Sequence, residues 1–181
     1  MVVLYVLLGL AVLALVVLKV FFFIEGEEQV VTREMGGWEL KTLEEKSMVI
    51  RKPVEIANVG KQAAVIMDAL VHPLLPYEQY DGVAVSGRPE LEGAPREDDY
   101  FEAVIVHRRG EAPDKLTVWV EVRLAARKGM NLKEALAHMV DFPVKLIWMQ
   151  SGRNPWCYFE KRLTAEAADI TRLAGVELAE D

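Results

Sequence analysis

The sequence predicts a mainly-β domain, built as a sandwich of two packed sheets, that is carried by one N-terminal transmembrane helix. Two observations lead to this fold class. The first 24 residues are almost wholly apolar. The rest of the chain alternates short apolar runs with Gly, Pro and Asn turn signals, which is typical of sandwiches. The 157 residues after the apolar segment are enough for one domain with its own core.

Residues 1–24 are predicted to be a retained membrane anchor. Lys19 is the one charged residue among them. As a helix they would reach roughly 36 Å, more than the ~30 Å hydrocarbon core of a bilayer. A cleaved signal peptide is the alternative, but the segment lacks the basic start, the shorter apolar core and the small-residue cleavage site of such peptides. We therefore expect residues 1–24 to lie in the lipid of a bacterial-type cell membrane.

Basic residues near the anchor favour a cytoplasmic domain. No Lys or Arg precedes the apolar run, whereas Lys19, Arg33 and Lys41 follow it. Loops that flank a membrane span carry their excess of Lys and Arg on the cytoplasmic side. The short N-terminus is accordingly expected outside.

The chain after the anchor divides into three segments. Residues 25–46 are acidic and weakly patterned, which indicates a juxtamembrane connector, with a short strand suggested at residues 29–32. Residues 47–175 form the β-rich globular domain, and residues 176–181 form an acidic tail.

Alternating and continuous apolar runs predict the strands of the domain. Val54 and Ile56 alternate with polar or proline residues before an Asn-Val-Gly-Lys turn. The clearest alternation is in residues 115–124, where every second residue is apolar. Further strands are expected at Gln62–His72, Gly82–Ser86, Tyr100–Arg108, Pro143–Gln150 and Trp156–Arg162.

Capping signals predict two short helices. Asn131 and Glu134 have the spacing of a capping box, and an apolar stripe continues from there to Val140. Thr164 is expected to cap a last helix, which Gly175 ends.

Two stretches resemble known families. Ile24–Gly36 is similar to the opening of stomatin-like (SPFH) proteins in its Glu-Gly-Glu turn, paired valines and glycine. The long coiled-coil helix of those proteins has no counterpart in this sequence, so we assign no family. The order of strands and turns over residues 46–125 resembles immunoglobulin-like β-sandwiches, without their Cys…Trp…Cys signature. An α+β sheet with both helices on one face is the alternative fold.

Charge and cysteine content exclude several function classes. The formal charge is −7, and because Lys19 is the only charge in the first 24 residues, the remainder carries −8. Such a domain would repel a polyanion, so no nucleic acid is expected as a partner. Cys157 is the single cysteine, which excludes an intrachain disulfide and Cys-x-x-Cys chemistry. We expect its thiol to be buried in a strand.

The sequence contains no motif for catalysis, a metal or a cofactor, and none is assigned. Five carboxylates in the expected loop Ser86–Asp99 could hold Ca²⁺ or Mg²⁺, but their spacing is not that of a calcium loop and a solvated loop is favoured. The three histidines, His72, His107 and His138, lack metal-binding spacing.

Aromatic and proline-bearing stretches are the best candidates for binding a protein partner. They contain Tyr77, Tyr80, Arg153 and Trp156, residue types that are frequent at interaction hot spots. Closure of the sandwich ends is the alternative role for these side chains. The sequence thus favours a membrane-anchored, non-enzymatic binding or scaffold module. The alternative is a membrane-tethered hydrolase or metal-dependent enzyme, with a site that joins His72 or His107 to Asp98 or Asp99.

Overall fold

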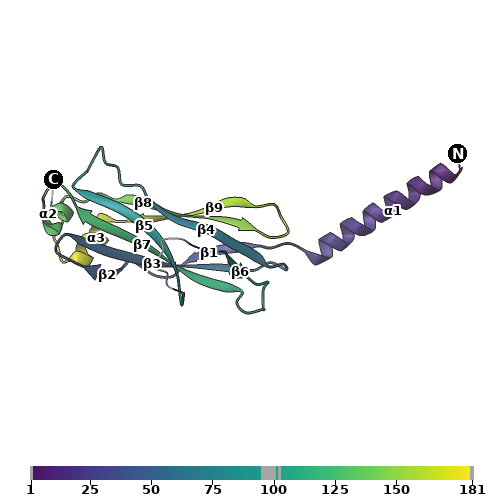
Figure 1. Ribbon diagram of the computed structural model, residues 1–181, viewed down its shortest axis with the longest axis horizontal. Helices are drawn as coiled ribbons and strands as arrows, with labels where there is room; N and C mark the ends of the chain where they lie inside the picture. The colour runs from purple at the N-terminus through teal and green to yellow at the C-terminus, as the bar shows by residue number, and fades with distance from the viewer. Residues whose placement is uncertain (1, 95–100, 102, 180–181) are drawn as a thin grey trace.

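Helix α1 (Val2–Glu25) extends away from a β-sandwich, as the computed structural model shows (Figure 1). The structure describes residues 2–94, 101 and 103–179. All residues of α1 are solvent-exposed, and the helix is long and apolar enough to cross a membrane. The same length and composition would also suit a signal sequence at this position.

Two antiparallel sheets make up the domain. The first contains β1 (Val30–Glu34), β2 (Glu39–Leu43), β3 (Ser47–Asn58), β5 (Val83–Leu91) and β7 (Lys115–Ala126). Its order is β1-β3-β7-β5, with β2 also paired to β3. The second contains β4 (Ala64–Pro73), β6 (Val104–Val106), β8 (Phe142–Ser151) and β9 (Cys157–Ala165), in the order β6-β4-β8-β9. These orders match the two sheets of an immunoglobulin-type sandwich with β6 added at one edge, so the predicted fold class is confirmed.

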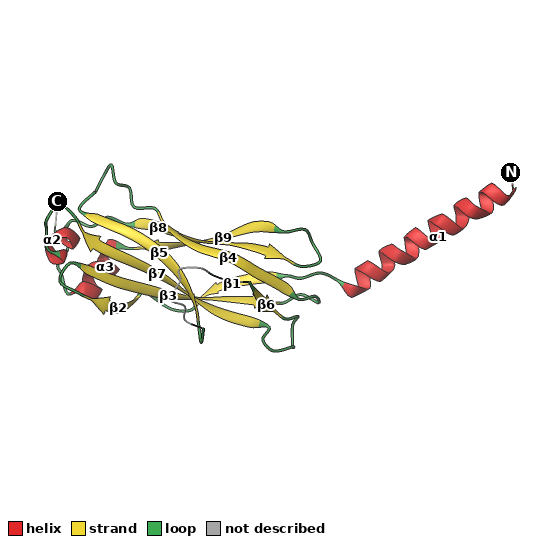
Figure 2. Ribbon diagram, in the orientation of Figure 1, coloured by secondary structure: helices red, strands yellow, loops and turns green. Residues whose placement is uncertain are grey.

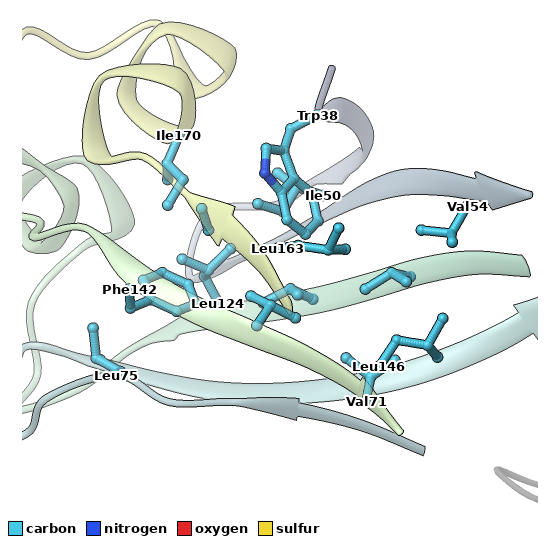
Figure 3. Packing of buried hydrophobic residues seen from close by; sticks show 14 of the residues in the cluster. Trp38, Ile50, Val54, Val71, Leu75, Leu124, Phe142, Leu146, Leu163 and Ile170 are labelled. Atoms are coloured by element: carbon cyan, nitrogen blue, oxygen red, sulfur yellow. The ribbon is translucent and has the colours of Figure 1, made fainter. Parts of the chain in front are cut away.

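The core lies between the sheets because their long strands alternate strictly. On β8 every second residue from Phe142 to Gln150 is buried, and on β7 the apolar residues Val118, Val120, Val122 and Leu124 are fully buried. Figure 3 shows such side chains from both sheets meeting in one layer, Ile50 and Leu124 from one sheet and Leu146 and Leu163 from the other. The predicted alternation of residues 115–124 is confirmed.

Two short helices, α2 (Leu132–Ala137) and α3 (Ala167–Ala174), close the end of the sandwich farthest from α1 (Figure 2). The capping box of Asn131 and Glu134 is confirmed. The predicted cap of α3 is wrong, because Thr164 still belongs to β9. Asp141 accepts the N–H of Ala167 at 2.7 Å instead, so a residue from another segment satisfies the start of α3.

Several expected strand bounds also differ. Two strands, β1 and β2, lie within residues 25–46, and both pair with β3. The chain is still a strand at Ser86–Leu91, where a loop was expected, because it pairs with β7 along its length. Residues 104–106 alone are a strand in the expected 100–108 run, of which residues 100 and 102 lie outside the described part. Cys157, expected to be buried, is exposed.

The junction between α1 and the sandwich is held by a buried carboxylate. Both oxygens of Glu28 accept backbone N–H groups of the turn between β8 and β9, from Arg153 at 2.9 Å and Asn154 at 3.1 Å. The turn between β3 and β4 binds the same linker, because Lys61 donates its backbone N–H to the Glu27 carbonyl at 2.9 Å. The hairpin turn of the second sheet and the turn that connects the two sheets therefore both bind residues 27–28.

Gly60 makes this close approach possible. A Cβ at this position would lie 2.3 Å from the backbone nitrogen of Gln29 and 2.5 Å from the carbonyl oxygen of Glu27. Gly152 is similarly tight, since a Cβ there would lie 2.4 Å from the carboxylate carbon of Glu28. The linker can pack on the domain only because these two turns have glycine there.

Replacing Gly60 by Ala should therefore destabilise the domain by about 1–3 kcal/mol, because backbone atoms must move to admit the methyl group. Urea unfolding of the full chain in detergent, followed by Trp fluorescence, measures this. The control is Gly37→Ala, where a Cβ would have no neighbour within 4 Å. Equal midpoints for the two variants would contradict the tight junction.

Candidate partner-binding edge

The first half of β9 is an open strand edge. This strand ends the sheet order, so one side of its backbone has no neighbouring strand in the described part of the chain. Residues 157–160 are exposed on both faces, whereas Leu163 and Ala165 further along are buried. An exposed edge that is also unpacked on its faces is a template for another strand.

Hydrogen bonds show which backbone groups point outward. The Pro143 carbonyl accepts the Leu74 N–H on the far side of β8, so the opposite residue, Thr164, is not bonded to β8. Consistently, the Thr164 carbonyl accepts the indole N–H of Trp38 at 2.8 Å. Because outward groups recur every second residue in an antiparallel pair, Tyr158 and Glu160 also direct their N–H and C=O groups to the edge.

The second half of β9 is covered by side chains. Trp38 lies over Thr164, and Lys161 pairs with Glu34 of β1 at 3.0 Å. Glu34 also pairs with Lys52 at 2.7 Å, although Lys52 occupies a core-facing position of β3 between Ile50 and Val54. The hydrogen bond from Lys52, together with that from Lys161, holds the pKa of Glu34 below its usual range. An ion network and an indole thus close this part of the edge.

Aromatic rings surround the open half. Trp156 and Tyr158 are each 63% exposed, and their rings meet edge to face with centroids 6.1 Å apart. On the opposite face Phe159 stacks on the buried Trp148 at 6.0 Å. A strand laid along this edge would find apolar surface on both of its faces, which an isolated backbone edge does not offer.

The structure separates the four residues predicted to bind a partner into two pairs. The Tyr80 hydroxyl donates to the carbonyl of Ala135 in α2, and burial together with Asp81 raises the pKa of Tyr80. The Tyr77 hydroxyl accepts the Val85 N–H at 3.2 Å. This pair ties the loop between β4 and β5 to the helical end of the sandwich.

The other pair lies at the end near α1. Arg153 donates to the Gly26 carbonyl at 2.8 Å, and its guanidinium lies 4.7 Å from the centre of the Phe22 ring. Arg153 therefore helps to hold the end of α1 against the sandwich. Trp156 is 63% exposed, against 45% for Tyr77, and the structure adds the exposed Tyr158 and Phe159 to it. The run Trp-Cys-Tyr-Phe in the sequence was the available signal, but only Trp156 was predicted to bind and Cys157 was expected to be buried.

The outer face of the first sheet carries two neighbouring carboxylates whose pKa values are shifted in opposite directions. Lys41 lies 2.5 Å from Glu121 and 2.9 Å from Glu90 beside a hollow of 330 Å³. Burial raises the pKa of Glu121, while the hydrogen bond from Lys41 lowers that of Glu90. Partial burial lowers the pKa of Lys41, but the hydrogen bonds to Glu121 and Glu90 outweigh this effect, so that its pKa is raised. Arg51 lies over the nearby Trp119 ring at 4.1 Å. We interpret this as an ion-pair cluster that covers the sheet.

The other candidates for chemistry remain apart. Glu90, from the expected acidic loop, lies in β5, and Glu97, Asp98 and Asp99 fall outside the described residues. The enzyme alternative that joined His72 or His107 to Asp98 or Asp99 is thus not described. Among residues 2–94, 101 and 103–179, no three His, Cys, Asp or Glu side chains are grouped to hold a metal ion.

Comparisons with known proteins give no family. No family model and no curated protein matches the sequence. Similar solved structures include the GAE domain of yeast GGA1, at 8% identity, a TM-score of 0.32 and coverage of 70% of this chain and 97% of that one. The GAE domain of GGA2p from Saccharomyces cerevisiae has 9% identity, a TM-score of 0.32 and coverage of 76% and 99%. The CooA pilin subunit of enterotoxigenic Escherichia coli has 9% identity, a TM-score of 0.28 and coverage of 67% of this chain and 80% of that one. At these TM-scores the likeness carries no functional argument.

Closure of the covered half of β9 should depend on pH through Glu34. A carboxyl group whose pKa is lowered on folding stabilises the protein above its unfolded pKa, and this contribution is lost as the pH falls below about 5. Glu34→Gln should cost about 1 kcal/mol at pH 7 and reduce the further loss of stability in acid. Urea midpoints at several pH values test this, with Glu45→Gln at an exposed turn as the control. An unchanged acid dependence in Glu34→Gln would contradict the role of the network.

Proposed function

We propose that this protein is a single-pass, membrane-anchored binding module without enzymatic activity. A protein partner binds to it by pairing one of its own strands with the open half of β9. The observation that carries the proposal is the contrast within this one strand. Its second half is closed by Trp38 and by the Glu34 network, whereas its first half presents, between exposed aromatic rings, backbone groups that pair with no strand in the described part of the chain. Main-chain hydrogen bonds give such strand addition its affinity, and side-chain pockets give it selectivity.

The anchor in this proposal is α1. A helix of 24 residues with every side chain exposed has no protein core to bury its apolar surface. Lipid is the environment that would satisfy it. The basic residues Lys19, in the C-terminal part of the helix, and Arg33 and Lys41 after it favour the cytoplasm for the domain. The grip of two turns on residues 27–28 would then hold the open edge at a defined height above the bilayer.

The single cysteine offers a direct test, since Cys157 is exposed at the start of the open edge. A photocrosslinker attached to Cys157 in alkaline-washed membranes should capture the partner in a discrete product. Glu160→Pro removes an outward N–H, a position where an edge strand tolerates proline. This variant, and the double change Trp156→Ala with Tyr158→Ala, should reduce capture about tenfold or more.

The matched control is Tyr77→Ala, which removes a half-exposed aromatic ring at the other end of the sandwich. It should leave capture at the level of the unmodified chain. Undiminished capture by Glu160→Pro, or neither a partner nor self-association in the unmodified chain, would overturn the proposed edge.

A further inference from the structure

An amphipathic cleft opens where α1 meets the sandwich, on loops other than the β8–β9 turn. It has a volume of about 770 Å³ and is formed by the end of α1, the β3–β4 turn and the β6–β7 loop. Ile24 and Val59 supply exposed apolar surface, and Lys61, Arg108 and Arg109 supply positive charge. One wall thus resembles the apolar surface of the span and another carries cations.

Hydrogen bonds place this cleft at the level where the apolar span ends. The Lys61 ammonium group donates to the Ile24 carbonyl at 3.2 Å, and the Gln62 amide donates to the Glu25 carbonyl at 3.1 Å. The β6–β7 loop joins the same turn, because Arg109 donates its backbone N–H to the Gly60 carbonyl at 3.1 Å. If α1 spans the bilayer, the cleft lies at the depth of the lipid headgroups.

The charges of the cleft leave a surplus for an anion. Arg108 is neutralised by Glu111, and Glu25 keeps its negative charge although it accepts the neutral side-chain amide of Gln62 at 3.1 Å. Lys61 and Arg109 therefore leave one net positive charge among the lining residues. Arg109, by contrast, has no side-chain hydrogen bond or ion pair among the described residues. Lys61 has two further ammonium protons beyond the one directed at Ile24. The net charge of the domain is negative, but binding at a surface depends on the local distribution of charge.

We infer that this cleft binds the phosphate of an anionic phospholipid, with Arg109 and Lys61 on the headgroup and with Val59 and Ile24 against the start of the acyl chains. This inference rests on the proposed membrane anchor. Guanidinium and ammonium groups are the usual ligands of phosphate. Basic residues beside a span attract acidic lipids by about 1 kcal/mol each. The bound lipid would fix the rotation of the domain about the helix.

The test uses the full chain in dodecyl maltoside, with dioleoyl-phosphatidylglycerol or dioleoyl-phosphatidylcholine added, and counts retained lipids by mass spectrometry of the intact protein. The unmodified chain should retain one phosphatidylglycerol in preference to phosphatidylcholine. Arg109→Gln should lower that population about fivefold, and Lys61→Gln with Arg109→Gln should lower it further. Arg33→Gln, the same substitution at an exposed arginine of β1, is the matched control and should have no effect.

The outcomes distinguish failure of the lipid site from failure of the membrane anchor. Equal retention of phosphatidylglycerol by Arg109→Gln and Arg33→Gln, or equal retention of the two lipids by the unmodified chain, would contradict lipid binding in the cleft. Displacement of the lipid by inorganic phosphate at the same concentration would assign the site to free phosphate and overturn the lipid. Carbonate extraction of the native membranes is measured in parallel. Release of the unmodified chain there would refute the anchor itself, whereas a retained chain without selective lipid would refute the cleft alone.

Discussion

The arrangement of this protein depends on the carboxylate of Glu28 at the junction of helix and sandwich. It is buried, and two backbone N–H groups of the β8–β9 turn satisfy it. Charge-assisted bonds of this kind are roughly twice as strong as neutral ones, and a buried acceptor without its donors would cost considerably more than an exposed one. The linker between α1 and the sandwich is therefore an ordered part of the fold.

This junction gives the two ends of the sandwich different roles. At the far end α2, α3 and the hydroxyl of Tyr80 close the core. At the near end the β8–β9 turn, which binds Glu28, leads into the open half of β9, and the β3–β4 turn, which binds Glu27, lines the cationic cleft. We therefore propose that both surfaces act close to the membrane, one toward a protein strand and the other toward lipid. Their separation on different loops allows each to be changed without the other.

Much of the fold could be predicted because it follows from local pattern. The alternation of residues 115–124 determines which face is buried, and the Asn131 and Glu134 spacing determines a helix start. Strand β2 was missed because all five of its residues are exposed and thus carry no apolar alternation. The start of α3 was misplaced because its satisfying acceptor, Asp141, comes from a distant segment. The periodicity of apolar residues indicates which side chains are buried. Contacts between segments that are distant in sequence can be identified only once the strand order is known.

The candidate sites were harder to predict for the same reason. Trp156 was predicted to bind because of its residue type. Which half of β9 is covered, and which half is left open beside Trp156, depends on Trp38 and Glu34, more than a hundred residues away. Cys157 was expected to be buried because apolar neighbours flank it in sequence. In the fold these neighbours lie at the unpacked end of an edge strand. The cationic cleft combines three segments, and no single one of them has a basic run long enough to be noticed.

Glu28 fixes the sandwich to the end of α1. Pulsed electron–electron dipolar spectroscopy in lipid nanodiscs measures this directly, with spin labels at the native Cys157 and at a Val3→Cys substitution in α1. A fixed junction predicts one narrow distance distribution, which Glu28→Ala should broaden. A broad distribution in the chain that retains Glu28, indistinguishable from that of Glu28→Ala, would contradict the account.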